Sequence, residues 1–133
     1  MKRISIVVEK NMNSGQKANV AAIIMGQLSQ DSSHLYGNLI RDQSGAYHAG
    51  IAVNLVVLDG GKEQLLSLVN NAVGCDVACV VFSSTGQSLS NNYPEYQKQI
   101  SSMDTRSTDI VGVGIVGEDS TVRTLTKKFS LVK

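Results

Sequence analysis

Short apolar runs alternate along the chain with polar turns and with segments of helical periodicity. Three runs are rich in β-branched residues and nearly free of polar ones, as buried strands are; they cover residues 4–8, 53–58 and 77–82. A fourth run, residues 110–116, is interrupted by Gly112 and Gly114. Glycine inside a strand often marks a close approach of the backbone to its surroundings, so we expect tight packing there.

The clearest helical period lies in residues 62–73, where apolar residues share one broad face and polar residues take the other. Asp59 is available to cap this helix at its start, and Gly74 stands where a C-terminal glycine cap belongs. Three more helices are expected behind polar capping residues: residues 14–30 after Asn13 or Ser14, a segment after Asn91 or Asn92, and a last one after Asp119 or Ser120.

Two stretches between these elements are predicted to be irregular. Residues 35–51 hold two weak extended segments around a turn that contains Gly45, which predicts a β-hairpin or a projecting loop. Residues 83–88 follow a strong strand and carry no charge, so we expect a polar loop there.

The order of these elements determines the expected fold class. Strands and helices alternate over residues 1–133, interrupted only by the hairpin. Such alternation predicts a single α/β domain, built as a three-layer α/β/α sandwich around a sheet that helices cover on both faces. The hairpin favours a mixed sheet of four or five strands over a purely parallel sheet.

Composition argues against several classes of protein and indicates the cellular compartment to expect. The net charge is +1 at pH 7, so no general attraction for nucleic acid is built in. No apolar run has the length of a membrane span, and the N-terminal residues do not read as a signal peptide, so we expect a cytoplasmic protein.

Cys75 and Cys79 do not form a Cys-x-x-Cys motif and are expected to be buried free thiols. His34 and His48 have no acidic or cysteine cluster at metal-ligand spacing, so neither a metal nor a cofactor is predicted.

The strongest candidate site is the polar segment that joins the first strand to the first helix. Ligands of α/β proteins bind at the carboxyl ends of strands, and polar side chains cluster just after residues 4–8: Lys10, Asn11, Asn13, Ser14, Gln16, Lys17 and Asn19. A second polar group follows the strand at 77–82: Ser83, Ser84 and Thr85. If these two strands are parallel neighbours, both loops meet over one crevice, and the Lys17 ammonium group points into it.

Two glycine motifs do not indicate a nucleotide site. The segment Gly15-Gln16-Lys17 lacks the glycine spacing and the hydroxyl residue of a Walker loop. Gly112, Gly114 and Gly117 match the dinucleotide-binding spacing, but the first two lie inside an apolar strand rather than after one. A helix N-terminus beside a lysine still attracts anions, which keeps a small anionic ligand among the candidates.

Four stretches together resemble a bacterial family known as domain of unknown function two-thousand, whose fold is similar to that of class II peptidyl-tRNA hydrolases. The stretches are Ile4–Val8, Gly15-Gln16-Lys17-Ala18-Asn19-Val20-Ala21-Ala22, Leu55-Val56-Val57-Leu58, and Asp109-Ile110-Val111-Gly112-Val113-Gly114-Ile115. Class II hydrolases cleave the ester that joins a peptide to tRNA. The resemblance therefore implies a peptidyl-tRNA hydrolase II-like fold, an esterase activity on peptidyl-tRNA, tRNA as a partner, and a homodimer.

The same resemblance implies roles for individual residues. Lys17 corresponds to the family's lysine, which would neutralise a phosphate or polarise the ester carbonyl, and Thr85 corresponds to a family threonine. The remaining site residues would orient the substrate or add hydrogen bonds to it: Asn13, Gln16, Asn19 and Ser83. Three departures stand against the hydrolase pattern. Gln16 intervenes between Gly15 and Lys17, and Val20 or Ala21 stands where the family has a glutamine in the helix. Residues 82–87 hold no carboxylate.

These departures leave two other functions open. One is a non-catalytic small-ligand or protein-binding module on the same scaffold, which an enclosed apolar pocket would favour. The other is a hydrolase of a different ester or amide, with a hydroxyl of residues 83–85 as nucleophile and His34 or His48 as base. RNA binding would be favoured by a basic face that combines three residues: Lys10, Lys17 and Arg41.

Overall fold

The computed structural model describes residues 1–133, which form seven strands, five α-helices and one 3₁₀ turn. In chain order they are β1 (Lys2–Glu9), α1 (Ser14–Asp31), β2 (Ile40–Arg41), β3 (Tyr47–His48), β4 (Asn54–Gly60), α2 (Lys62–Ala72), β5 (Val77–Ser83), α3 (Ser84–Ser88), α4 (Tyr93–Ser101), the 3₁₀ turn (Thr105–Ser107), β6 (Ile110–Glu118), α5 (Asp119–Thr126) and β7 (Ser130–Leu131). None of the helices combines the length and the hydropathy needed to cross a lipid bilayer.

A five-stranded mixed sheet forms the centre of the molecule, with the strand order β5-β6-β1-β4-β7. β1 pairs with β4 in parallel, while β6 runs antiparallel to both β1 and β5. β1, β4 and β5 therefore point the same way, and β6 and β7 point the opposite way. This confirms the predicted α/β class with a mixed sheet and adds β7, which the sequence pattern did not indicate because it is only two residues long.

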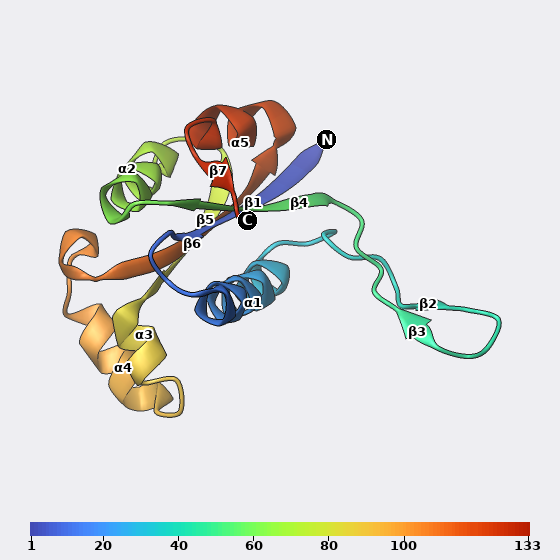
Figure 1. The fold of residues 1–133 in the computed structure, drawn as a ribbon, viewed down its shortest axis with the longest axis horizontal. Coiled ribbons are helices and arrows are strands. Elements are labelled where there is room, and N and C mark those ends of the chain that lie inside the picture. The colour runs from blue at the N-terminus through green and yellow to red at the C-terminus, as the bar shows by residue number, and fades with distance from the viewer.

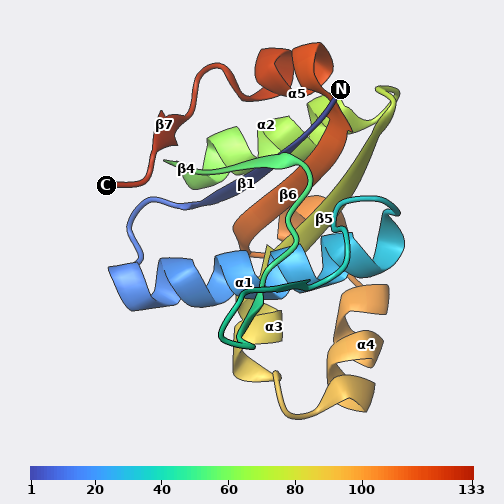
Figure 2. The same cartoon turned by 90° about the vertical axis from the view of Figure 1, so that its right-hand side faces the viewer.

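Helices cover the sheet on both faces and give three layers (Figure 1). α1 packs across β1, β6 and β5 on one face, and α2 and α5 pack on the other. Figure 2 shows α3 and α4 at the end of the molecule nearest β5. Each face has its own core. The first contains Ile4, Ile6, Val8, Val20, Ile24 and Leu28, and the second contains Val7, Leu65, Leu68, Val113, Ile115 and Val122. Each fully buried Ile or Leu stabilises the fold by roughly 1.5–3 kcal/mol.

The glycines of β6 allow α1 to lie close against the sheet. A Cβ atom at Gly112 would come within 2.6 Å of Val20 Cγ1, and one at Gly114 within 2.3 Å of Ile24 Cγ2. Any larger side chain would push the helix away. The close approach expected from the glycine-interrupted strand is therefore confirmed, and the neighbour is α1.

Most helices begin and end near the capping residues predicted from the sequence. Asn13 Oδ1 accepts from the Gln16 backbone N–H at 2.9 Å, and Gln16 Oε1 accepts from the Asn13 N–H at 3.1 Å, so α1 begins with a capping box. Gly74 follows α2 with φ +86°, a conformation that favours glycine. The expectation that Asp59 caps α2 was wrong. Asp59 lies inside β4, and the residue at the cap position is Gly61.

Two expectations about the region around β5 were wrong. Residues 84–88 form the short helix α3 rather than a polar loop. Cys75 and Cys79 are exposed rather than buried. Cys75 lies in the turn between α2 and β5, and Cys79 lies on β5, an edge strand that is paired on its inner side only. An apolar run of six residues does not distinguish an edge strand from a central one, since pairing partners are set by distant residues.

The predicted hairpin is confirmed as β2 and β3, which pair with each other and project from the body of the molecule (Figure 1). Asp42 organises its turn, since one carboxylate oxygen accepts from the backbone N–H groups of Ser44 and Ala46 and the other pairs with His48 Nε2 at 2.7 Å. The hydrogen bond from His48 holds the pKa of Asp42 below its usual value. The Arg41 guanidinium lies 5.9 Å from the centre of the Tyr47 ring.

Candidate functional site

We call one end of the sheet, where strands begin or stop, the carboxyl edge. The strands β1, β4 and β5 end there, and β6 begins there. β1 and β5 are parallel, as the site hypothesis required, but they are not neighbours, because β6 lies between them. The two polar segments nevertheless touch. Gln87 Nε2 donates to the Met12 sulfur at 3.8 Å, which joins α3 to the segment before α1.

Lys17 forms the most enclosed ion pair of this edge. Its Nζ lies 3.2 Å from Asp59 Oδ2, and the two side chains are only 15% and 21% exposed. Lys17 comes from the first turn of α1 and Asp59 from the end of β4, so the pair ties the helix to the strand on the side of β1 away from β5. The Lys17 ammonium is thus directed to a carboxylate on β4 rather than to Thr85 on α3.

The other predicted residues of the first segment have local roles. The polar groups of Asn13 and Gln16 are engaged with each other's backbone in the capping box. Asn19 is exposed on α1, and its side chain makes no hydrogen bond within the protein. The capping box fixes the direction in which α1 leaves the carboxyl edge, and so it positions Lys17.

The predicted residues of the second segment lie at the carboxyl end of β5. Ser83 is 2% exposed, and its hydroxyl has no hydrogen-bond partner. Thr85 is half-buried in α3, where its carbonyl accepts the backbone N–H of Leu89. No histidine is available here as a base. His48 is on the projecting hairpin (Figure 1), and His34 follows the far end of the 18-residue α1, about 27 Å along the helix.

A hollow of about 450 Å³ opens between the end of β1 and the start of α2. No hydrophobic residue lines it, and the lining residues are Glu9, Lys10, Asn11, Gly61, Lys62, Glu63 and Gln64. Glu9 is 5% exposed, and one of its carboxylate oxygens accepts the Asn11 backbone N–H at 3.0 Å. The sequence pattern did not single out Glu9, so this buried carboxylate at the edge was missed.

Asp109 supplies a carboxylate next to α3, although residues 82–87 contain none. Its backbone carbonyl accepts the Ser84 N–H at 2.8 Å, and its side chain pairs with Lys62. The hydrogen bond from Lys62 holds the pKa of Asp109 below its usual value, and the Ser84 hydroxyl acts in the same direction. Asp109 directly precedes β6, so only the pairing of β6 with β5 brings it to Ser84.

Removing the Asp109 charge is expected to change how stability depends on pH. Because its pKa is lowered on folding, its contribution is present above the unfolded pKa of about 4 and disappears as the pH falls through the lower folded value. Both partners are about half exposed, so we expect Asp109→Asn to cost only a few tenths of a kcal/mol at pH 7. Urea unfolding at pH 7 and pH 3 measures this, and the difference between variant and wild type should be smaller at pH 3 than at pH 7.

The matched control is Asp76→Asn, which removes an exposed carboxylate without a hydrogen-bond partner on its side chain. It should leave the unfolding free energy nearly unchanged at both pH values. A cost of Asp109→Asn that is the same at pH 3 as at pH 7 would show that the Lys62 pair does not stabilise the fold.

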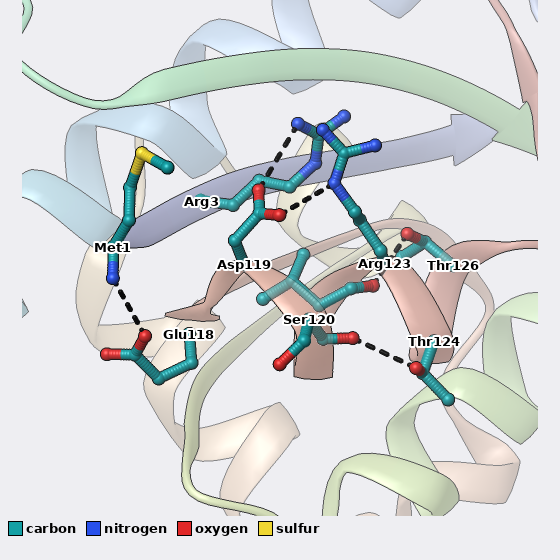
Figure 3. Close-up of polar contacts among 9 residues, drawn as sticks. Met1, Arg3, Glu118, Asp119, Ser120, Arg123, Thr124 and Thr126 are labelled. Carbon is teal, nitrogen blue, oxygen red and sulfur yellow. Dashed lines mark hydrogen bonds and ion pairs between the residues drawn. The ribbon is translucent and has the colours of Figure 1, made fainter.

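The opposite edge of the sheet carries a second polar cluster that the sequence did not indicate (Figure 3). Asp119 lies between two guanidinium groups, with Oδ1 3.7 Å from Arg3 and Oδ2 2.8 Å from Arg123 Nε. The Met1 ammonium lies 2.9 Å from Glu118 Oε2, and the Met1 carbonyl accepts the Asp119 N–H. These contacts fasten the start of β1 to the junction of β6 and α5. Because they pair residues within the scaffold, we assign them a structural role.

Comparison with known proteins supports a fold and a family but no activity. Curated proteins gave no match. A solved structure of a protein of unknown function from Agrobacterium tumefaciens strain C58 is similar, with a TM-score of 0.86 and 17% sequence identity over 99% of this chain and 98% of that one. At this identity the similarity concerns the fold alone. The family model described as protein of unknown function (DUF2000) matches residues 2–133, so the chain belongs to the DUF2000 family.

Proposed function

We propose that this protein is an esterase of the peptidyl-tRNA hydrolase type, on a scaffold similar to that of class II peptidyl-tRNA hydrolases. The observation that carries the proposal is the Lys17–Asp59 pair at the carboxyl edge, 3.2 Å apart and largely shielded from solvent. Charged groups held in such surroundings interact more strongly with a substrate than the same groups in water. The site lies where α/β proteins bind their ligands.

In this proposal Lys17 acts on the charge that develops during ester cleavage. Attack by water on the ester carbonyl places negative charge on the carbonyl oxygen, and an ammonium group directed at that oxygen stabilises it. Asp59 holds the ammonium in place and accepts the proton that the attacking water loses. That proton then passes to the departing ribose oxygen of the tRNA, so the products are a tRNA with a free hydroxyl and a peptide acid, which loses its own proton to solvent.

Ester release from a peptidyl-tRNA tests the proposal. Wild type should release the peptide faster than the uncatalysed reaction, and Lys17→Met should slow the release by at least about tenfold, the effect of losing one charge-assisted hydrogen bond. Lys62→Met is the matched control, because it removes a lysine whose pair is half exposed. Equal rates for wild type and Lys17→Met, or no release above background, would overturn the proposal.

A second candidate, a non-catalytic binding module, is favoured by the distribution of charge. Lys17 and Lys62 are each paired with a carboxylate. Arg41 stands on the projecting hairpin, away from the end of β1 that carries Lys10 (Figure 1). The three residues expected to form a basic face for RNA are Lys10, Lys17 and Arg41. Lys17 is neutralised by its carboxylate partner, and Arg41 is separated from Lys10. On this second candidate the folded wild type releases no ester from peptidyl-tRNA.

A further inference from the structure

The hairpin that projects from the molecule carries a large share of its exposed apolar side chains. We call residues 36–51 the arm. Its base is the bridge between Tyr36 and Ile51, and its tip is the turn between β2 and β3. Of the eleven large hydrophobic side chains that are exposed, five belong to the arm, with exposed fractions from 45% to 66%: Tyr36, Leu39, Ile40, Tyr47 and Ile51. Apolar residues scattered over a surface need no explanation, but a group of five on one projection does.

The body of the protein gives the arm little support. β2 and β3 contact chiefly each other, and Figure 1 shows them extending away from the sheet and its helices. The turn at the tip is held by polar contacts of its own, in which the Asp42 carboxylate accepts from the Ser44 and Ala46 N–H groups. A two-stranded hairpin alone is only marginally stable in water. The apolar side chains of the arm therefore need a surface that the rest of the chain does not supply.

The exposed area is of the size that a protein interface needs. With about 200 Å² for each large side chain, the five expose roughly 500 Å² together, near the top of the range for the largest apolar patch on a monomer. Two arms and the surfaces that they cover would bury on the order of 1,500 Å² in total, which is the size of a specific, stable interface.

The outer face of α1 is the surface of this chain that suits the arm. Between Ala18 and Gln30 this helix has no charged residue, whereas α2, α4 and α5 each carry at least one acidic and one basic residue. The exposed residues of the face are small or uncharged: Asn19, Ala22, Ile23, Gly26 and Gln30. An apolar arm can cover such a face without removing water from a charge, which would be costly.

The arm projects from the side of the molecule on which α1 is open. Figure 2 views that side, and no other helix lies in front of α1 there. A two-fold rotation can therefore lay the arm of each copy on α1 of the other in two equivalent contacts, as the closed symmetry of a dimer requires. We infer that two copies of this protein form such a dimer, in which each arm packs on the outer face of α1 of the second copy. Ester cleavage plays no part in this contact, so the interface holds for either proposed function.

Sedimentation equilibrium of the wild-type chain from about 1 to 100 µM tests the association. We expect the mass to rise with concentration toward twice the chain mass of 14.2 kDa. Amide hydrogen exchange of residues 36–51 should slow by at least about tenfold over the same range, because dimer formation covers the arm. Both measurements require no variant. A chain that stays monomeric at the highest concentration would overturn the inference and leave the arm to a partner of another kind.

Leu39→Lys and Ala22→Lys test the two sides of the contact. Each adds an unpaired charge that the symmetric dimer would bury twice, so each should raise the dissociation constant at least about a hundredfold. Both positions are exposed in the single chain, so circular dichroism should show the wild-type fold. The matched control is Val73→Lys at the end of α2, on the other face of the sheet, and it should dimerise as wild type does.

Three results with these variants would overturn the inference. Dimerisation of Leu39→Lys as strong as that of wild type would show that the arm lies outside the interface. Dissociation by Leu39→Lys but not by Ala22→Lys would place the arm on a part of the second copy other than α1. Equal weakening by Val73→Lys would show a non-specific effect of the added charge.

Discussion

Replacing Gly114 with valine is expected to lower the free energy of unfolding by about 3 kcal/mol, at the upper end of the cost of overpacking a core. The first added carbon would already lie 2.3 Å from Ile24 Cγ2 and 2.8 Å from Leu28 Cδ1. Ile24 is β-branched and fully buried, so it has few alternative rotamers with which to make room. α1 must therefore move away from β6. Urea unfolding followed by circular dichroism measures the loss, with an unchanged m-value as the sign of the same unfolding reaction.

Gly26→Ala provides the matched control on the same helix. Gly26 is an exposed residue of α1, and a Cβ there would meet nothing within 4 Å. Alanine in a helix interior is favoured over glycine by about 1 kcal/mol, so this variant should be more stable than wild type. If Gly114→Val were as stable as wild type, α1 would not lie as close to the sheet as the contacts of Gly114 require.

The sequence carried enough information for elements whose causes are local. The cap at Asn13 depends on residues within one helical turn, and the amphipathic period of α2 is contained in eleven residues. The hairpin was likewise visible, because its turn is formed by Asp42 and the residues that follow it directly. In each case the interaction joins residues close in sequence, so the local sequence pattern is enough to predict the structure.

The site could be predicted only as far as its position. The rule that ligands gather at carboxyl ends of strands predicts a candidate site at the carboxyl edge. It did not reveal that β6 lies between β1 and β5, that Lys17 would face Asp59, or that Asp109 would lie beside Ser84. These pairs are 42 and 25 residues apart, and strand order alone brings them together. The exposure of Cys79 was missed for the same reason, because edge position is a property of the whole sheet.

Breaking the Lys17–Asp59 pair is expected to produce the second largest loss of stability. Lys17→Met keeps the apolar stem of the side chain and removes the charge, which leaves the Asp59 carboxylate largely buried without its partner. Removing one member of a shielded pair leaves an uncompensated charge, and we expect a cost on the order of 2 kcal/mol at this partial exposure. Asp59→Asn should cost a similar amount, because it leaves the ammonium unpaired. Urea unfolding at pH 7 measures both.

The double variant Lys17→Met/Asp59→Asn separates the pair from the individual side chains. Once both charges are gone no unpaired charge remains, so the double variant should lose at least 1 kcal/mol less than the sum of the single losses. The Lys62–Asp109 pair has the same chemistry at greater exposure, and its cycle should give less than about 1 kcal/mol and decline in 1 M salt. Additive losses at Lys17 and Asp59 would mean that the two charges do not support each other. The assignment of Asp59 as the partner of Lys17 in ester cleavage would then have to be abandoned.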